Sequence, residues 1–248
     1  MFYGIPENKL AEFKEAYSIF KGIFPTMYAA DMLITFARNR SFMLDTHFTE
    51  SFSTYAETEQ ERSLIWRLHT LAWAAGHAMN IKGDFVECGV LKGFSSKVLC
   101  KYLDFGNTEK QFYLYDTFSG LPVETSTQQE REGWDYSDLD PETLLQEVRQ
   151  AFSAYSNVMV VPGMVPTIFE TTVPDKIAFL HIDMNSEQAE MLALEYLFDR
   201  VTPGGIIVLD DFGWIVNQNQ MISELKFMAE REHMVLELPT GQGLVIKH

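Results

Sequence analysis

The chain has 248 residues, of which 46% are hydrophobic and 22% are charged, and these proportions are typical of a globular protein with a sizeable core. Acidic residues number 35 and basic residues 19, so the net charge of −16 argues against nucleic acid or an anionic membrane as a partner, because phosphates would be repelled. No apolar run approaches the roughly 20 residues of a membrane span, and the first residues do not show the basic stretch, apolar core and cleavage site expected of a secretory leader. With two cysteines and no disulfide framework indicated, we expect a cytoplasmic protein.

The first part of the chain has apolar residues at helical spacing. Two segments show it, "NKLAEFKEAYSIFKGIF" (8–24) and "RSLIWRLHTLAWAAGHAMN" (62–80), and the polar stretch 45–60 between them is predicted to be a linker. We therefore expect residues 1–82 to form a helical extension packed on a core domain of residues 83–248. The apolar helices of this extension favour a homo-oligomer.

From Gly83 onward, short strands alternate with helices. Strands are predicted at "DFVECGV", "FYLYDTF", "VMVVPG", "IAFLHID", "GGIIVLDD", "MVLELP" and "GLVIK", with helices around "SSKVLCKYL", "ETLLQEVRQAFSAY", "EQAEMLALEYLFDR" and "QNQMISELKFMAERE". This alternation predicts an α/β fold with a Rossmann-like, doubly wound, mostly parallel seven-stranded sheet. The last two strands are separated by "TGQ" alone, which predicts an antiparallel last strand.

Ligands of open α/β sheets bind beyond the carboxyl ends of the strands, so polar residues at those ends are candidate site residues. In "VECGVLKGFSS", Gly89 and Gly93 would let a ligand approach the backbone and the start of the next helix. Their spacing matches neither the dinucleotide fingerprint nor a phosphate loop, and any tight turn can use glycine. Glu87, at the end of the first strand, needs a polar partner, and a ligand with an ammonium group is one candidate.

Asp116 ends the second strand of the predicted sheet. A carboxylate at this position can accept hydrogen bonds from both hydroxyls of a ribose. The alternative is that Asp116 only stabilises a turn or caps a helix, because aspartate is favoured there. Together with the glycine turn, the position favours ribose binding.

Three carboxylates follow the fourth and fifth strands. Asp183, Asp210 and Asp211 could converge as oxygen ligands of magnesium or calcium. The alternative is that Asp211 caps the next helix while Asp210 faces solvent. Asn185 would lie on the same side as Asp183 if the chain stayed extended, and His181 is expected to be a hydrogen-bonded core histidine more readily than a catalytic base. The acidic segment 130–140 is either a solvated loop or a lid over the strand ends.

Several of these stretches, taken in order, resemble the macrocin O-methyltransferase family of S-adenosylmethionine-dependent enzymes, which methylate sugar hydroxyls in antibiotic biosynthesis. The resemblance runs from about residue 60 to the C-terminus and is carried by "GDFVECGVLKGFSS", "YLYDTFSGLP", "VVPGMVPTIFE", "IAFLHIDMNSEQAEMLALEYL", "VTPGGIIVLDDFGW" and "LPTGQGLVIK". The ordered series is far more specific than any one of these motifs.

The resemblance implies a role for each candidate residue. The methionine portion of S-adenosylmethionine would contact Glu87, Gly89, Gly93 and Ser95; the ribose would contact Asp116; and the adenine would border Gly163 and Met164. Asp183, Asp210 and Asp211 match three magnesium ligands of the family. The metal would hold two neighbouring substrate hydroxyls and lower the pKa of the one to be methylated.

Asn185 departs from the family pattern. The family resembles "HIDxD" here, with the second aspartate as general base, and an amide cannot accept a proton at neutral pH. His181, a lid carboxylate or water would then take the proton. We expect an O-methyltransferase that acts on a small hydroxylated molecule, a sugar or polyol-like natural product, with magnesium assistance. The alternatives are a non-catalytic protein that binds S-adenosylmethionine and, less favoured, a nucleotide-dependent oxidoreductase.

Overall fold

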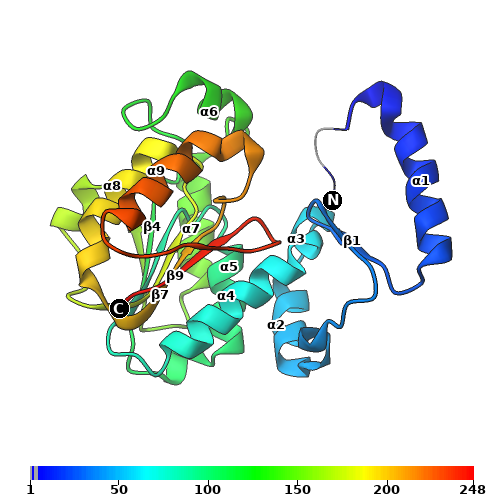
Figure 1. The fold of residues 1–248 in the computed structure, drawn as a ribbon. Helices are drawn as coiled ribbons and strands as arrows, with labels where there is room; N and C mark the ends of the chain where they lie inside the picture. The colour runs from blue at the N-terminus through cyan, green and yellow to red at the C-terminus, as the bar shows by residue number, and fades with distance from the viewer. Residues whose placement is uncertain (1, 3–4) are drawn as a thin grey trace.

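One seven-stranded sheet forms the centre of the protein (Figure 1). The computed structural model describes residue 2 and residues 5–248, and the sheet has the strand order β5-β4-β3-β6-β7-β9-β8. The strands are β3 (Asp84–Cys88), β4 (Phe112–Asp116), β5 (Val158–Pro162), β6 (Ile177–Ile182), β7 (Val201–Leu209), β8 (Leu236–Glu237) and β9 (Gly243–Ile246). Strands β3 to β7 are parallel, whereas β9 is antiparallel to both β7 and β8. The predicted Rossmann-like sheet with an antiparallel last strand is confirmed.

Helices cover both faces of the sheet (Figure 1). The core helices are α4 (Ile65–Ala78), α5 (Phe94–Tyr102), α6 (Gln128–Gly133), α7 (Pro141–Ala151), α8 (Glu187–Leu197) and α9 (Gln218–Ala229). Helices α4, α5 and α7 contribute to one hydrophobic cluster, and α8 and α9 contribute to a second. Strand β6 supplies Phe179 to the first cluster and Leu180 to the second, so its six residues are all buried. Coverage on both faces explains why this strand is a continuous apolar run in the sequence.

The N-terminal segment is more varied than the helical extension that the sequence predicted. Its elements are the 3₁₀ helices η1 (Glu7–Lys9) and η2 (Ser41–Leu44), the helices α1 (Leu10–Ile23), α2 (Thr46–Tyr55) and α3 (Glu59–Ser63), and the antiparallel strands β1 (Tyr28–Ala30) and β2 (Leu33–Thr35). Figure 1 shows α1 standing apart from the sheet, and none of its described residues is buried. Helix α4, by contrast, packs on β6 and β7. The domain division at residue 82 stays a prediction.

The polar linker predicted for residues 45–60 is wrong, because this stretch contains helix α2. Asp45 caps the helix by accepting a hydrogen bond from the backbone N of Phe48 at 3.0 Å. Phe48 and Phe52 are four residues apart, lie on one face and are buried where α2 packs against α5. Two apolar residues anchor the helix, and the polar residues that suggested a linker cover its outer face.

The remaining short elements connect the core. They are the 3₁₀ helices η3 (Phe105–Asn107), η4 (Thr167–Glu170), η5 (Phe198–Arg200) and η6 (Ile215–Asn217). Within the described residues, no helix combines the length and the apolar character needed to cross a membrane.

Candidate functional site

The strand order of the sheet reverses between β3 and β6, and a buried polar pair lies at this point. Glu87 and His181 are register partners on these adjacent strands, with the Nδ1 atom of His181 2.8 Å from the Oε1 atom of Glu87. The Ser96 hydroxyl at the start of α5 donates to Oε2 of Glu87. Glu87 is only 2% exposed, so its polar partners come from the protein itself. Its contact with the cofactor stays a prediction.

The carboxylates around His181 favour its protonated form. Burial lowers the pKa of this imidazole, but the nearby Asp210 carboxylate and the hydrogen bond to Glu87 outweigh burial and hold the pKa well above its ordinary value. The Nε2 atom lies 3.3 Å from the Oδ1 atom of Asp210. A protonated imidazole cannot accept another proton, which favours the predicted structural role over that of general base.

The glycine turn packs directly against the end of β6. Gly89 has a φ of 88°, and a Cβ atom there would lie 1.8 Å from the carbonyl oxygen of Asp183. Gly93 has a φ of 69° at the N-cap of α5, where a Cβ would lie 2.9 Å from the Phe152 ring. Both positions therefore require glycine for conformation and packing. Ser95 follows in the first turn of α5, half-buried.

The Asp116 side chain stabilises two turns, the glycine turn after β3 and the turn that follows Asp116 at the end of β4. One carboxylate oxygen accepts from the backbone N of Val90 at 2.6 Å and of Leu91 at 2.8 Å. The other accepts from the backbone N of Phe118 at 2.6 Å. The turn-stabilising alternative thus describes what this side chain does in the structure, and ribose binding stays a prediction. The backbone carbonyl of Asp116 accepts from Gly163 N at 2.9 Å, and this bond brings Gly163 and Met164 beside it.

Asp210 and Asp183 come together at the ends of β7 and β6. Among the described residues, His181, Asp183 and Asp210 each offer a ligand atom within 4.8 Å of the others. Asp210 is buried and also accepts from Nε2 of Gln242 at 2.8 Å, so the solvent-facing alternative for Asp210 is excluded. The chain turns after Asp183, where Asn185 has a φ of 54°. The segment is therefore not extended, and alternation along a strand does not align these two side chains.

Arg67 is a central residue of this site that the sequence analysis did not identify. Its Nη1 atom donates to the Asp210 carboxylate and lies 3.3 Å from Oδ1 of Asp211. Its Nε atom donates to Oδ2 of Asp31, at the β1–β2 turn, at 3.2 Å. Arg67 is 7% exposed. An arginine inside the apolar stretch "LIWRLHTLAW" was the available signal, because a buried cation needs anionic partners.

The carboxylates outnumber the cations that balance them. Burial raises the pKa of Asp210, but the charges of Arg67 and His181 outweigh burial and leave it below its ordinary value. Burial and the charges of Asp210 and Asp211 hold the pKa of Asp183 well above its ordinary value. Burial also raises the pKa of Asp211 to about 6, although Arg67 opposes it. This excess of oxygen donors and negative charge fits a divalent cation held by carboxylates.

The acidic segment 130–140 belongs to a stretch that docks beside the site. Oε1 of Glu130 accepts from the backbone N of Glu187 at 2.9 Å, and the Ser186 hydroxyl donates to the carbonyl of Thr125. Figure 1 shows α6 at the end of the sheet where the parallel strands finish. Burial raises the pKa of Tyr136, and the charge of Asp183 raises it further. The role of a lid over the strand ends stays a prediction for this segment, and the charge effect of Asp183 adds Tyr136, which the sequence did not indicate, to the residues near the site.

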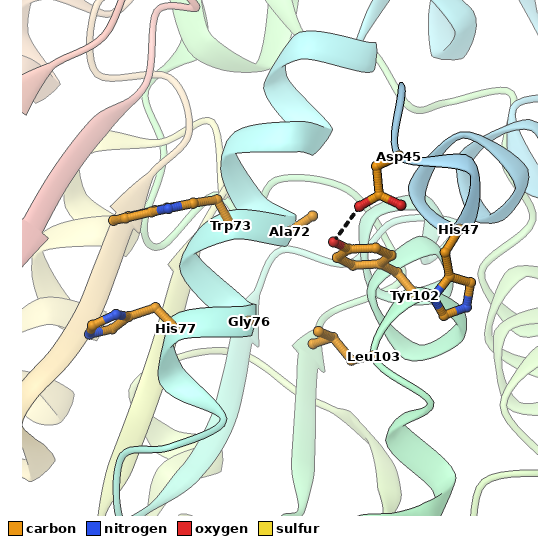
Figure 2. A pocket seen from close by; sticks show the side chains of 8 residues that line it. All are labelled: Asp45, His47, Ala72, Trp73, Gly76, His77, Tyr102 and Leu103. Atoms are coloured by element: carbon orange, nitrogen blue, oxygen red, sulfur yellow. Dashed lines mark hydrogen bonds between the residues drawn. The ribbon is translucent and has the colours of Figure 1, made fainter. Parts of the chain in front are cut away.

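A surface hollow of about 620 Å³ lies elsewhere, between α2, α4 and α5 (Figure 2). The Tyr102 hydroxyl donates to Asp45 at 2.8 Å on one side of α4, whereas Trp73 and His77 point to the other side. None of the predicted site residues lines this hollow. We therefore do not take this hollow as the candidate site, despite its volume.

Comparisons with known proteins identify the family of the chain and structures that share its fold. Residues 62–235 match the model of the macrocin O-methyltransferase (TylF) family. A Streptomyces olivaceus protein, 8-demethyl-8-(2,3-dimethoxy-alpha-L-rhamnosyl)-tetracenomycin-C 4'-O-methyltransferase, is 28% identical over 151 residues, 54% of this chain and 55% of that protein. Mycinamicin III 3''-O-methyltransferase from Micromonospora griseorubida is 27% identical over 161 residues, 59% of this chain and 62% of that protein. The matched region spans less than two thirds of each of these relatives.

The solved structure of the O-methyltransferase NovP shares the fold. The alignment covers 84% of this chain and 99% of NovP, with a TM-score of 0.65 and 18% sequence identity. At that identity the similarity supports the fold alone. Because the family match extends over more than half of the sequence, the chain belongs to the macrocin O-methyltransferase family.

Proposed function

We propose that the protein is an S-adenosylmethionine-dependent O-methyltransferase that acts on a hydroxyl group of a small sugar or polyol-like natural product. The observation that carries the proposal is the acidic cluster around Asp183 and Asp210, placed directly against the glycine turn at the switch point of the sheet. Family membership and the O-methyltransferase names of the two curated relatives support the same activity.

The glycine turn and the ends of β4 and β5 fit S-adenosylmethionine. Asp116 makes three hydrogen bonds, while a carboxylate has about four acceptor positions, so it retains capacity for a ribose hydroxyl. Gly163 and Met164 lie next to it and would border the adenine. The cofactor supplies an activated methyl group, and the task of the protein is to align the acceptor oxygen with it.

Magnesium would be held by Asp183 and Asp210 with Asp211. When bound, it would lower the pKa of a substrate hydroxyl. The protein's own residues provide the charge balance at this place, because Arg67 and His181 contact the same carboxylates. Within the described chain, the Oδ1 atom of Asn185 is buried and has no hydrogen-bond partner. It can accept a hydrogen bond from a substrate hydroxyl and orient it, although it cannot remove the proton.

Asn185 also favours a second candidate function, a non-catalytic protein that binds S-adenosylmethionine. Turnover with a panel of hydroxylated acceptors distinguishes the two functions, since only the enzyme forms a methylated product. Localisation in the cytoplasm remains part of the proposal, and so does a homo-oligomer, for which exposed apolar residues of α1 such as Ile19 and Ile23 provide a surface.

Isothermal titration calorimetry with S-adenosylmethionine tests the proposal directly. We expect saturable binding to one site per chain, and weaker binding in Asp116→Ala. A folded parent protein that shows no binding would refute both candidate functions.

A further inference from the structure

We infer that Arg67 is a built-in counter-cation that competes with the divalent metal for Asp210 and Asp211, and that Asp31 holds the guanidinium while the metal is bound. This inference rests on the metal site of the proposed function. It assigns a role to a residue of α4 and to the hairpin between β1 and β2, both outside the strand ends that hold the other site residues.

The contacts of Nη1 place the guanidinium charge on the predicted metal ligands. This single nitrogen donates to the side chain of Asp210, donates to its backbone carbonyl at 3.2 Å, and lies 3.3 Å from Oδ1 of Asp211. Arginine remains protonated at any relevant pH, so this charge cannot be removed by titration. A divalent cation that used the same carboxylate oxygens would have to replace Nη1 there.

The opposite edge of the guanidinium has its own partner. Nε donates to Oδ2 of Asp31 at 3.2 Å, and both side chains are 8% exposed. The Trp214 ring lies 5.3 Å from the guanidinium carbon, close enough for a cation–π contact. Arg67 could therefore release Asp210 without becoming an unpaired buried charge, because Asp31 and Trp214 would keep it in place.

Among the described residues, Arg67 is the ion-pair partner of the buried Asp31 carboxylate. It is one of the two turn residues between β1 and β2, with a φ of 48°, and turn carboxylates are ordinarily solvated. Its burial beside Arg67 joins the N-terminal hairpin to the acidic cluster. Metal binding would then strengthen the Asp31–Arg67 pair and hold the hairpin against the site.

Magnesium affinity, measured by calorimetry on the full chain at fixed pH, tests the inference. Arg67→Gln removes the competing charge, and we expect magnesium to bind about tenfold more tightly or better. Asp31→Asn removes the alternative partner, and we expect magnesium to bind several-fold more weakly. The two effects have opposite signs, whereas general damage to the fold would weaken binding in both variants. Arg149→Gln, an exposed arginine of α7, is the matched control and should bind like the parent.

The double variant Arg67→Gln/Asp31→Asn shows whether Asp31 affects magnesium affinity through Arg67 or through its own charge. In an Arg67→Gln background we expect Asp31→Asn to change magnesium affinity by less than twofold. If Asp31 acted only through its own charge on the metal, its effect would persist unchanged. If Arg67→Gln does not fold, Asp31→Asn alone decides, and unaltered magnesium affinity in it overturns the inference.

Failure of the inference and failure of the proposed function are distinguishable. Titration of the same proteins with S-adenosylmethionine tests the function independently of the metal. If Arg67→Gln binds S-adenosylmethionine like the parent but binds magnesium no more tightly, the competition is refuted and the proposed function stands. If neither protein binds magnesium, Arg67 competes with no metal, and the inference is again overturned.

Discussion

His181 and Glu87 bridge the two strands between which the order of the sheet reverses, with Nδ1 and Oε1 2.8 Å apart in a fully buried setting. The pair connects the glycine turn, through Ser96 on α5, with the acidic cluster, through Asp210. Removal of Glu87 would leave a buried imidazolium with one anionic partner fewer. The pair therefore holds the start of α5 and the acidic cluster together, and each of its charges lowers the cost of burying the other.

Glu87→Gln should destabilise the protein. We expect a loss of about 3 kcal/mol in the free energy of unfolding, because one partner of a buried ion pair is removed. Urea unfolding measures this, with the exposed Glu109→Gln as control. A loss below about 1 kcal/mol would mean that His181 is neutral in the native state.

Gly89→Ala should lower both stability and cofactor affinity. The added Cβ would lie 1.8 Å from the carbonyl oxygen of Asp183, and the φ of 88° disfavours any side chain. We expect the free energy of unfolding to fall by more than about 3 kcal/mol and S-adenosylmethionine to bind at least tenfold more weakly. Gly22→Ala is the matched control, since nothing lies within 4 Å of its Cβ position. Unchanged cofactor affinity in a folded Gly89→Ala protein would contradict the predicted role of the turn.

Asp183→Asn should abolish magnesium binding and spare cofactor binding. One of the three predicted carboxylate ligands becomes a neutral amide, which is a poorer ligand for a hard cation. Calorimetry with magnesium and with S-adenosylmethionine measures both effects, and Asp175→Asn, exposed before the amino end of β6, is the control. Equal magnesium affinity in Asp183→Asn and the parent would remove Asp183 from the ligand set.

We expect a buried pair of carboxyl groups, Glu190 and Glu224, to make the free energy of unfolding fall as pH rises. Burial raises the pKa of Glu224 to about 8 from an ordinary value of 4.5, and Glu190 beside it is also raised by burial and by the charge of Glu224. The folded state therefore binds a proton that the unfolded state releases above about pH 4.5. The stabilisation that this bound proton gives the folded state is complete below that pH and is lost as the pH rises through about 8.

Glu224→Gln tests this pH dependence. We expect a flatter profile of melting temperature between pH 5 and 8 than in the parent, since a neutral amide does not titrate. Glu195→Gln, on the exposed side of α8, should retain the parent's slope. Parallel profiles for Glu224→Gln and the parent would show that the pair is not protonated in the folded state.

The strands of the central sheet were predictable because each β-rich run is bounded by a helix or a polar turn, and β6 is buried along its whole length. Their order in the sheet was not predicted. The two-residue hairpin turn between β1 and β2 was not, since strands of three residues give too short a pattern. Helix α2 was missed because only its inner face is apolar.

The acidic strand ends were identified from position alone, whereas their partners were not. Arg67 contacts Asp210 across 143 positions of the sequence and Asp31 across 36. A pattern within one helix or strand contains no information on such distant pairs. The hydrogen bonds of Asp116 to the glycine turn were hidden for the same reason, because 25 and 26 positions separate the partners.

Asn185→Asp should increase turnover. The substitution restores the "HIDxD" pattern and supplies a carboxylate where the structure has an amide whose Oδ1 is buried without a hydrogen-bond partner in the described chain. The φ of 54° is tolerated by aspartate as it is by asparagine, so the backbone need not change. General bases contribute roughly 10²-fold or more to such reactions, and we expect kcat to rise at least tenfold with a hydroxylated acceptor.

Steady-state kinetics with one acceptor, at several pH values, measures this gain and its dependence on the ionisation of the new carboxyl group. Asn80→Asp, exposed just after α4, adds the same charge far from the strand ends and should leave kcat unchanged. A gain from a parent without turnover would identify Asn185 as the residue that keeps the natural protein inactive. Equal or lower kcat in Asn185→Asp would mean that proton removal here does not depend on this position, which would leave water or a carboxylate of the lid segment, such as Glu130, as the acceptor.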